Sequence, residues 1–221
     1  MVVCRWGLVD RLVVGRRFRR GRVWVRRVGR RLSATWNVGR RVLVPDLRNP
    51  LPNATYTVDG RFHYTTDGWA RTVRLEVDRL DKVGEAFRSR SNYIQSRVNK
   101  YGSELAADID QRYEGGHIVG DQFGGPPEEI NTVAMLEEVN QTRIGKESNS
   151  YLLLERKVAA KPENYNNLVL EFEYPEPADP TKLTNTERVP KKFEVKWTNA
   201  AGEADSKPFE NLPPQKRVGV N

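Results

Sequence analysis

The stretch of the sequence best suited to chemistry is RYEGGHIVGDQFGGPPEEINTVAMLEEVN, residues 112–140. It contains His117, one of only two histidines in the chain, among closely spaced glycines and prolines. An imidazole titrates near neutral pH and can take a proton from water when its ring is held in one tautomer. His117 is therefore a candidate general base for a hydrolysis, such as that of a phosphodiester.

Oxygen donors for a cation follow the histidine along the chain. Asn131 and Asn140 can each offer a neutral carbonyl oxygen, and Glu155 follows in the next predicted helix. A hard divalent cation such as Mg²⁺ prefers oxygen ligands, keeps several waters and stabilises the negative charge that develops at a phosphoryl centre. On residue types alone an alternative stays open, in which the glycines form a tight turn around a packed imidazole and the asparagines are caps or turn formers.

The order of these motifs resembles the DNA/RNA non-specific endonuclease family. The match is to the branch used as C-terminal toxin domains of bacterial secretion-system effectors and polymorphic toxins, and it spans about residues 53–212. It rests on Gly-Gly-His ending at His117, Phe-Gly-Gly at 123–125, Asn-x-Val-x-Met at 131–135, Asn140, and Leu-Glu at 154–155.

The resemblance implies a ββα-metal (His-Me finger) nuclease that cleaves DNA, RNA or both. Carried over by position, His117 is the general base and Asn140 the direct ligand of Mg²⁺ or Mn²⁺. Asn131 orients the site or the shell of the ion, and Glu155 holds metal-bound water. The branch also implies a secreted or delivered effector that acts in the cytoplasm of a target cell and has a cognate immunity protein.

Two positions depart from the family pattern. Glu114 stands where the family usually has aspartate, and Gly115 stands where the wider family has an arginine that grips phosphate. The phosphate-binding arginine therefore lies elsewhere, and the candidates are Arg90, Arg97 and Arg112.

The basic charge of the chain is confined to its first fifth. The net charge is +8, but residues 1–48 carry +12 and residues 49–221 carry −4. The arginine-rich segment is either a basic arm that holds phosphates or a disordered or non-native leader. A rival function follows from the first option, namely a catalytically decayed nucleic-acid-binding protein that uses this arm. A second rival is a partner-binding domain in which His117 only packs.

Periodicity predicts the elements that must position these residues. Two short β-rich runs flank Asp59-Gly60 in a predicted hairpin over 54–66, and TVRLEV (72–77) alternates as a third strand. Helical spacing covers 91–102 and 149–160, and strict alternation predicts antiparallel strands over 167–174 and 192–197. The fold class is α+β with an antiparallel sheet and short helices. His63 falls in a predicted strand, where a lone histidine is usually a surface or half-buried side chain.

Three segments are expected: an arginine-rich leader (1–48), the endonuclease domain (49–212) and a flexible C-terminal tail (213–221). The leader lacks a clear signal peptide, and no apolar run approaches the roughly 20 residues that a membrane-spanning helix needs. With Cys4 as the single cysteine, an intramolecular disulfide is excluded.

Overall fold

The computed structural model describes residues 23–27, 30–34, 45–85, 88, 90–107, 112–141 and 149–213. Within these ranges the fold is α+β, as predicted, with a large antiparallel sheet, a small two-stranded sheet and short helices. The strands are β1 (Val23–Arg27), β2 (Arg30–Ala34), β3 (Ala54–Val58), β4 (Phe62–Thr66), β5 (Thr72–Arg79), β6 (Tyr113–His117), β7 (Thr132–Leu136), β8 (Asn166–Glu173), β9 (Lys192–Thr198) and β10 (Ala204–Glu210). The helices are α1 (Pro45–Arg48), α2 (Asn92–Asn99), α3 (Glu137–Asn140) and α4 (Tyr151–Ala160), with short 3₁₀ turns η2 (Lys100–Gly102), η3 (Asp121–Phe123), η4 (Glu129–Asn131), η5 (Pro162–Asn164) and η6 (Thr186–Arg188).

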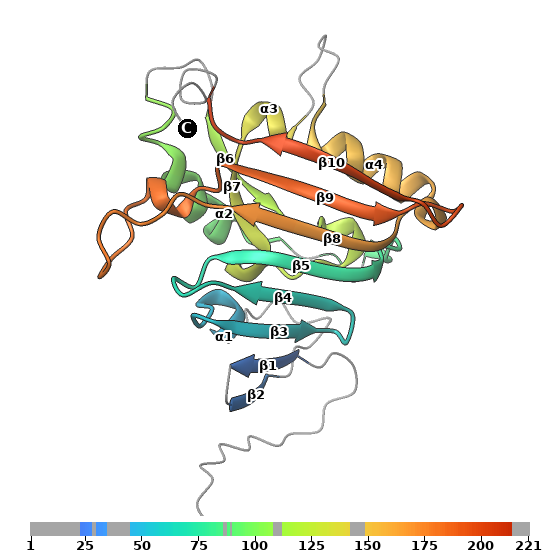
Figure 1. Cartoon of the computed structure of the whole chain (residues 1–221), viewed down its shortest axis with the longest axis horizontal. Coiled ribbons are helices and arrows are strands. Elements are labelled where there is room, and N and C mark those ends of the chain that lie inside the picture. Colours follow the sequence, from blue (N-terminus) through green and yellow to red (C-terminus); the bar gives the residue numbers. More distant parts are fainter. Residues whose placement is uncertain are drawn as a thin grey trace, which may run out of the picture.

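The large sheet has the order β10-β9-β8-β5-β4-β3-β1-β2, with antiparallel pairing throughout its described strands. The β5–β8 neighbours are far apart in sequence, and the helices and strands described between them lie on one face of the sheet (Figure 1). That insertion contains α2, the β6–β7 hairpin, α3 and α4. All the site residues predicted from the sequence, from Arg90 to Glu155, lie in it.

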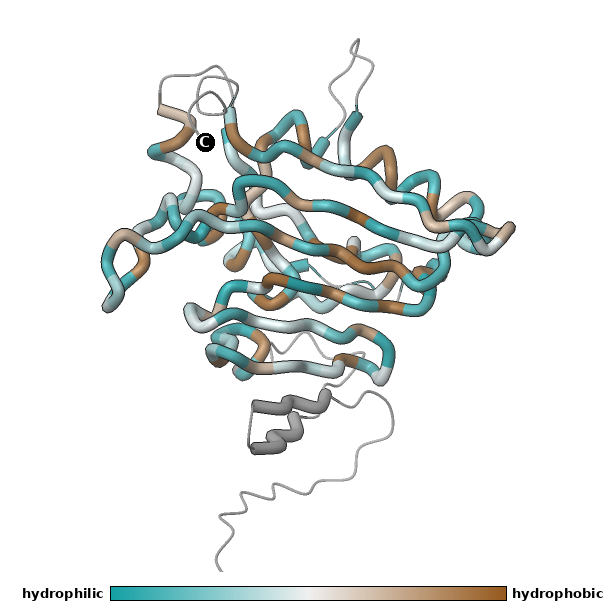
Figure 2. The backbone as a smooth tube through the Cα atoms, in the orientation of Figure 1, coloured by the Kyte–Doolittle hydropathy of each residue, from teal (hydrophilic) through white to brown (hydrophobic). Residues whose placement is uncertain are grey.

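Alternation along the strands decides which face of the sheet is covered. In β8 the residues Leu168, Leu170 and Phe172 are buried, and their neighbours are more exposed. Figure 2 shows the same alternation of apolar and polar positions along the central strands. The buried face packs against the insertion, because the ring of Tyr151 in α4 meets the rings of Phe193 and Phe209 edge to face.

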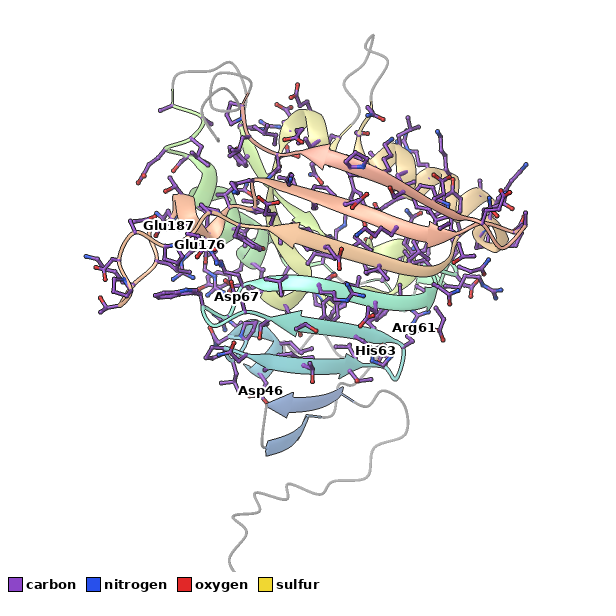
Figure 3. All side chains as sticks on the ribbon, in the orientation of Figure 1. Asp46, Arg61, His63, Asp67, Glu176 and Glu187 are labelled. Atoms are coloured by element: carbon purple, nitrogen blue, oxygen red, sulfur yellow. The ribbon has the colours of Figure 1, made fainter. Side chains whose placement is uncertain are left out.

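The predicted hairpin between β3 and β4 is present. Asp59 and Gly60 both have positive φ, at 54° and 73°, as an Asp-Gly turn between two strands requires. His63 is exposed on β4, as expected for a lone strand histidine, with Nδ1 3.1 Å from the Thr57 hydroxyl (Figure 3).

Two strands that precede the predicted domain boundary at residue 49 pair with the large sheet. β1 pairs with β3 in register from Val23 opposite Val58 to Arg27 opposite Ala54, and β2 continues the sheet. Leu47 in α1 is fully buried in the core. Described parts of the predicted leader thus contact the sheet and its core, with β1 covering the edge of β3. The remainder of the leader, and the tail beyond residue 213, lie outside the described residues.

Both predicted helices are present and capped. Ser91 accepts a hydrogen bond from the Ile94 N–H at the start of α2, and Ser150 accepts one from the Leu153 N–H at the start of α4. None of the described helices is long and apolar enough to span a bilayer.

Candidate active site

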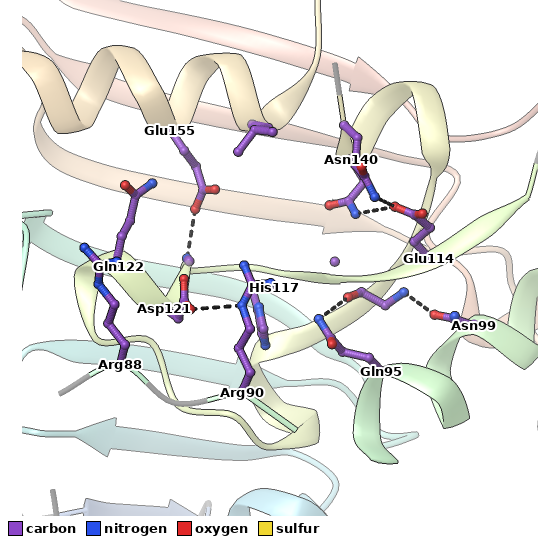
Figure 4. Close-up of a pocket in the computed structure, with 15 residues that line it drawn as sticks. Arg88, Arg90, Gln95, Asn99, Glu114, His117, Asp121, Gln122, Asn140 and Glu155 are labelled. Carbon is purple, nitrogen blue, oxygen red and sulfur yellow. Dashed lines mark hydrogen bonds and ion pairs between the residues drawn. The ribbon is translucent and has the colours of Figure 1, made fainter. Parts of the chain in front are cut away.

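A cavity of about 550 Å³ opens where β6 meets α2, α3 and α4. Its lining is mainly polar and comes from six parts of the chain (Figure 4). The lining residues are Arg88, Arg90, Gln95, Asn99, Glu114, Gly115, Gly116, His117, Gly120, Asp121, Gln122, Asn140, Gln141, Leu152 and Glu155. Three of the predicted site residues, His117, Asn140 and Glu155, meet in this one cavity although 38 positions separate the first from the last.

His117 is the last residue of β6 and lines the cavity. Its Nε2 is buried and has no hydrogen-bond partner among the described residues. Burial lowers the pKa of His117 from 6.5 to about 4, with a further lowering by Arg90 that Asp121 partly offsets. The imidazole is therefore neutral at physiological pH and able to accept a proton.

The backbone before His117 is bare because neighbouring elements leave no room for side chains. A methyl group at Gly115 would stand 2.7 Å from Gln95 Cα and 2.8 Å from its carbonyl oxygen. A methyl group at Gly116 would stand 2.8 Å from Asn140 Oδ1. An arginine at position 115, as in the wider family, would thus collide with the backbone of α2.

Asn140 ends α3 and reaches across to β6. Its Nδ2 donates a hydrogen bond to Glu114 Oε2 at 2.8 Å, and its Oδ1 faces the Gly116 backbone. With the amide nitrogen occupied, the carbonyl oxygen is the atom that Asn140 presents on the histidine side of the cavity. A carbonyl oxygen is a ligand that Mg²⁺ and Mn²⁺ accept.

Glu155 reaches the cavity from the middle of α4. Its Oε1 accepts a hydrogen bond from the Gly120 N–H at 2.8 Å, close to the histidine loop. Burial raises the pKa of Glu155 from 4.5 to about 7; the Gly120 N–H and Arg90 lower it, and Asp121 raises it. The second carboxyl oxygen is free to hold a water molecule, as the resemblance implies for this position.

Asn131 does not line the cavity and is fully buried. Its Oδ1 accepts hydrogen bonds from Tyr64 Oη at 2.9 Å and from the Val119 N–H at 2.8 Å. Its Nδ2 donates to the carbonyls of Val119 and Pro126, each at 2.9 Å. Of the two roles predicted for it, orienting the site fits this geometry. A contact with the shell of an ion does not, since the protein already uses all four hydrogen-bonding positions.

The three candidate arginines occupy different places. Arg90 lines the cavity and pairs with Asp121 at 2.9 Å. Arg97 pairs with Glu129 and donates to the Arg48 carbonyl, outside the cavity. Arg112 is 70% exposed, pairs with Glu114 and Glu137, and is not among the lining residues. Of these three arginines, Arg90 is the one that lines the cavity beside the histidine, and phosphate binding by any of them stays a prediction.

Sequence reasoning missed Arg88, which lines the cavity two residues before Arg90. The alternation of the two arginines in RSR was the available signal, because it puts two cations on one short segment. It also missed Asp121, the partner of Arg90, and the amides Gln95 and Asn99 that hold the Gly115 backbone. No signal in the sequence marked these amides, since they act through a contact between α2 and β6.

The donors at the cavity suit an ion held by few direct protein ligands. The described part of the chain contains no cluster of three or more His, Cys, Asp or Glu side chains with the geometry of a metal site. Asn140 Oδ1 and the carboxyl group of Glu155 instead face a polar cavity with room for water. This set fits Mg²⁺ or Mn²⁺, which keep several waters and bind protein through few groups.

A comparison with known protein families matches the part of the chain that contains the cavity. A family model for DNA/RNA non-specific endonucleases matches residues 52–174, which include β3 to β8 and the whole cavity. The chain belongs to this family. It is a nuclease, a hydrolase whose substrate is nucleic acid.

The hydrogen bonds of Asn131 predict a structural effect of its removal. Asn131→Ala leaves buried groups on Val119, Pro126 and Tyr64 without partners, each costing on the order of 1–3 kcal/mol. We expect the free energy of unfolding, measured with urea, to fall by about 3 kcal/mol or more. Tyr64→Phe, which removes one bond, should cost only about 1 kcal/mol. An equal decrease in the free energy of unfolding in the two variants would contradict the conclusion that Asn131 satisfies several buried groups at once.

The opposite pKa shifts of Glu155 and His117 predict the pH dependence of stability. Between pH 4.5 and about 7 the folded state binds more protons at Glu155 than the unfolded state does, so this group lowers stability as pH rises. Between about pH 4 and 6.5 the folded state binds fewer protons at His117, so this group raises stability as pH rises.

Removal of one of these two groups should therefore leave the pH dependence of stability that is due to the other. Relative to the unmodified chain, Glu155→Gln should gain stability as pH rises from 4.5 to 7, and His117→Ala should lose stability as pH rises from 4 to 6.5. Urea unfolding at a series of pH values, with EDTA present, measures both trends. A Glu155→Gln profile parallel to that of the unmodified chain would mean that this carboxyl group is not protonated in the range.

Proposed function

We propose that the chain is a metal-dependent endonuclease that hydrolyses phosphodiester bonds in DNA, RNA or both, with His117 as general base. The observation that carries the proposal is the meeting of His117, Asn140 and Glu155, from three separate elements, in one polar cavity.

His117 supplies the base. Its ring is uncharged at neutral pH and lines the cavity, so it would take the proton of an attacking water molecule. Asp121 and Arg90 beside it are paired with each other, which keeps a full negative charge away from the imidazole. The Asp121 carboxylate therefore does little to stabilise a protonated His117 ring. The ring would readily release the proton again.

Asn140 and Glu155 would hold the divalent cation, Mg²⁺ or Mn²⁺. Asn140 offers its carbonyl oxygen directly, and Glu155 offers a carboxyl oxygen to bound water. When bound, such an ion stabilises the negative charge that develops on the phosphoryl group and its leaving oxygen.

Arg90 and Arg88 would bind the substrate phosphates. Both side chains line the cavity, and a guanidinium binds phosphate oxygens through two parallel hydrogen bonds. Arg90 is 63% exposed and pairs with Asp121, so a phosphate would compete with that carboxylate for it. These two cations place positive charge locally in a domain whose residues 49–221 sum to −4.

The two histidines provide a matched pair for the test. His117→Ala should reduce plasmid cleavage in Mg²⁺ by about 10²- to 10⁴-fold, the usual contribution of a positioned general base. His63→Ala removes the other, exposed histidine and should leave cleavage unchanged. EDTA should abolish cleavage by the unmodified chain, and added Mg²⁺ or Mn²⁺ should restore it.

The same assay separates the rival functions. If the folded, unmodified chain binds nucleic acid without cutting it in Mg²⁺ or Mn²⁺, it is a decayed nuclease that only binds. If His117→Ala cuts as fast as His63→Ala, the ring at position 117 only packs.

The branch of the family that the sequence resembles supports a toxin role as part of the proposal. The chain would be delivered as an effector into the cytoplasm of a target cell, and the producing cell would carry a cognate immunity protein. Expression of the chain inside a bacterium should therefore degrade nucleic acid and reduce viability, whereas expression of His117→Ala should not. Normal growth with active, soluble enzyme present would rule the toxin role out.

A further inference from the structure

The carboxylate of Glu114 is surrounded by hydrogen-bond donors at the wall of the cavity. Oε2 accepts from Asn140 Nδ2 at 2.8 Å and also from the side-chain amide of Gln141. Oε1 accepts from Nε and from a terminal nitrogen of Arg112, at 3.3 and 3.1 Å. The side chain is 13% exposed, so water has little access to these bonds.

We propose that Glu114 is a positioning residue that sets which atom of Asn140 faces the ion. The inference rests on the proposed function, because it assumes that Asn140 is a metal ligand. Glu114 would thus have a role different from those of the general base and the metal ligands, namely to orient the Asn140 amide.

The argument begins with the chemistry of an amide. A carboxamide has an oxygen and a nitrogen of nearly equal size, so packing alone does not select between its two orientations. Only the oxygen can bind a cation, since the amide nitrogen has no available lone pair. An asparagine that serves as the main ligand therefore needs a neighbour that accepts hydrogen bonds and never donates them.

Glu114 is such a neighbour. An ionised carboxylate only accepts, so it must face the NH₂ group of Asn140 and turn Oδ1 the other way. Turned so, Oδ1 lies over the bare backbone of Gly116, next to His117 in sequence. The two donors from Arg112 fix the opposite oxygen of the carboxylate and hold its plane.

This role predicts that the effect of Glu114 depends on the residue at position 140. In the Asn140 background, Glu114→Ala removes the acceptor that holds the Asn140 amide nitrogen, so the carbonyl oxygen is no longer fixed toward the ion. With Asn140→Asp in place, the side chain presents an oxygen in either orientation. Removal of Glu114 should then matter much less.

The test measures Mn²⁺ binding directly, by loss of the free-ion signal in electron paramagnetic resonance, with the full chain. Glu114→Ala should raise the dissociation constant about 10- to 100-fold, as is usual for a lost partner of a metal ligand. In the Asn140→Asp background the same substitution should change the constant by less than about 3-fold, well below that range. Glu114→Gln should raise the dissociation constant less than Glu114→Ala does in the same background. It should still raise it, since one amide oxygen cannot serve both Arg112 and Asn140.

Glu129→Ala is the matched control, because it removes another arginine-paired carboxylate that does not line the cavity. It should leave Mn²⁺ affinity unchanged. A thermal melt of each variant establishes that it is folded, and if Glu114→Ala does not fold, Glu114→Gln in the two backgrounds gives the same comparison.

The outcomes separate this inference from the proposed function. If Glu114→Ala weakens Mn²⁺ binding by the same factor in both backgrounds, Glu114 acts through its charge alone and the positioning role is overturned. If Asn140→Ala loses Mn²⁺ and Glu114→Ala does not, the positioning role is again overturned while the ion site stands. If Asn140→Ala binds Mn²⁺ as tightly as the unmodified chain, the ion site and the positioning role both fall.

Discussion

The active site depends on the close approach of other elements to the backbone of β6. At Gly115 and Gly116 the space that a side chain would fill is taken by the backbone of α2 and by the amide of Asn140. Because no side chain intervenes, the strand that carries His117 can lie against α2 on one side and α3 on the other. Gly120, just after the histidine, lets Glu155 of α4 bind its N–H in the same way.

That convergence leaves many polar groups in a confined space, and the molecule satisfies them in pairs. Asp121 pairs with Arg90, Glu114 with Arg112 and the amide of Asn140, and the amides of Gln95 and Asn99 with Gly115. Pairing lowers the cost of holding these groups away from water. His117, whose Nε2 has no hydrogen-bond partner in the part of the chain that the structure describes, and Arg88 both line the cavity.

Much of the framework follows from local sequence. The Asp59-Gly60 turn, the alternation in β5, β8 and β9, and the serine caps of α2 and α4 each depend on a few neighbouring residues, so each was predictable. The edge of the sheet was not. β1 and β2 lie in a segment whose arginine content gave no strand signal, and they form because β3 offers an open edge for pairing.

The sequence by itself determined the chemical groups of the site: one histidine among glycines, two asparagines and a glutamate, in an order that matches a nuclease family. Tertiary structure alone decided what each group does. Asn131 and Asn140 are the same residue type nine positions apart, yet one is buried with all its hydrogen bonds used and the other presents an oxygen to the cavity. Likewise, Arg90 reaches the cavity while Arg97 is held by Glu129. The physical reason is that orientation and burial come from contacts between elements distant in sequence, which no local pattern encodes.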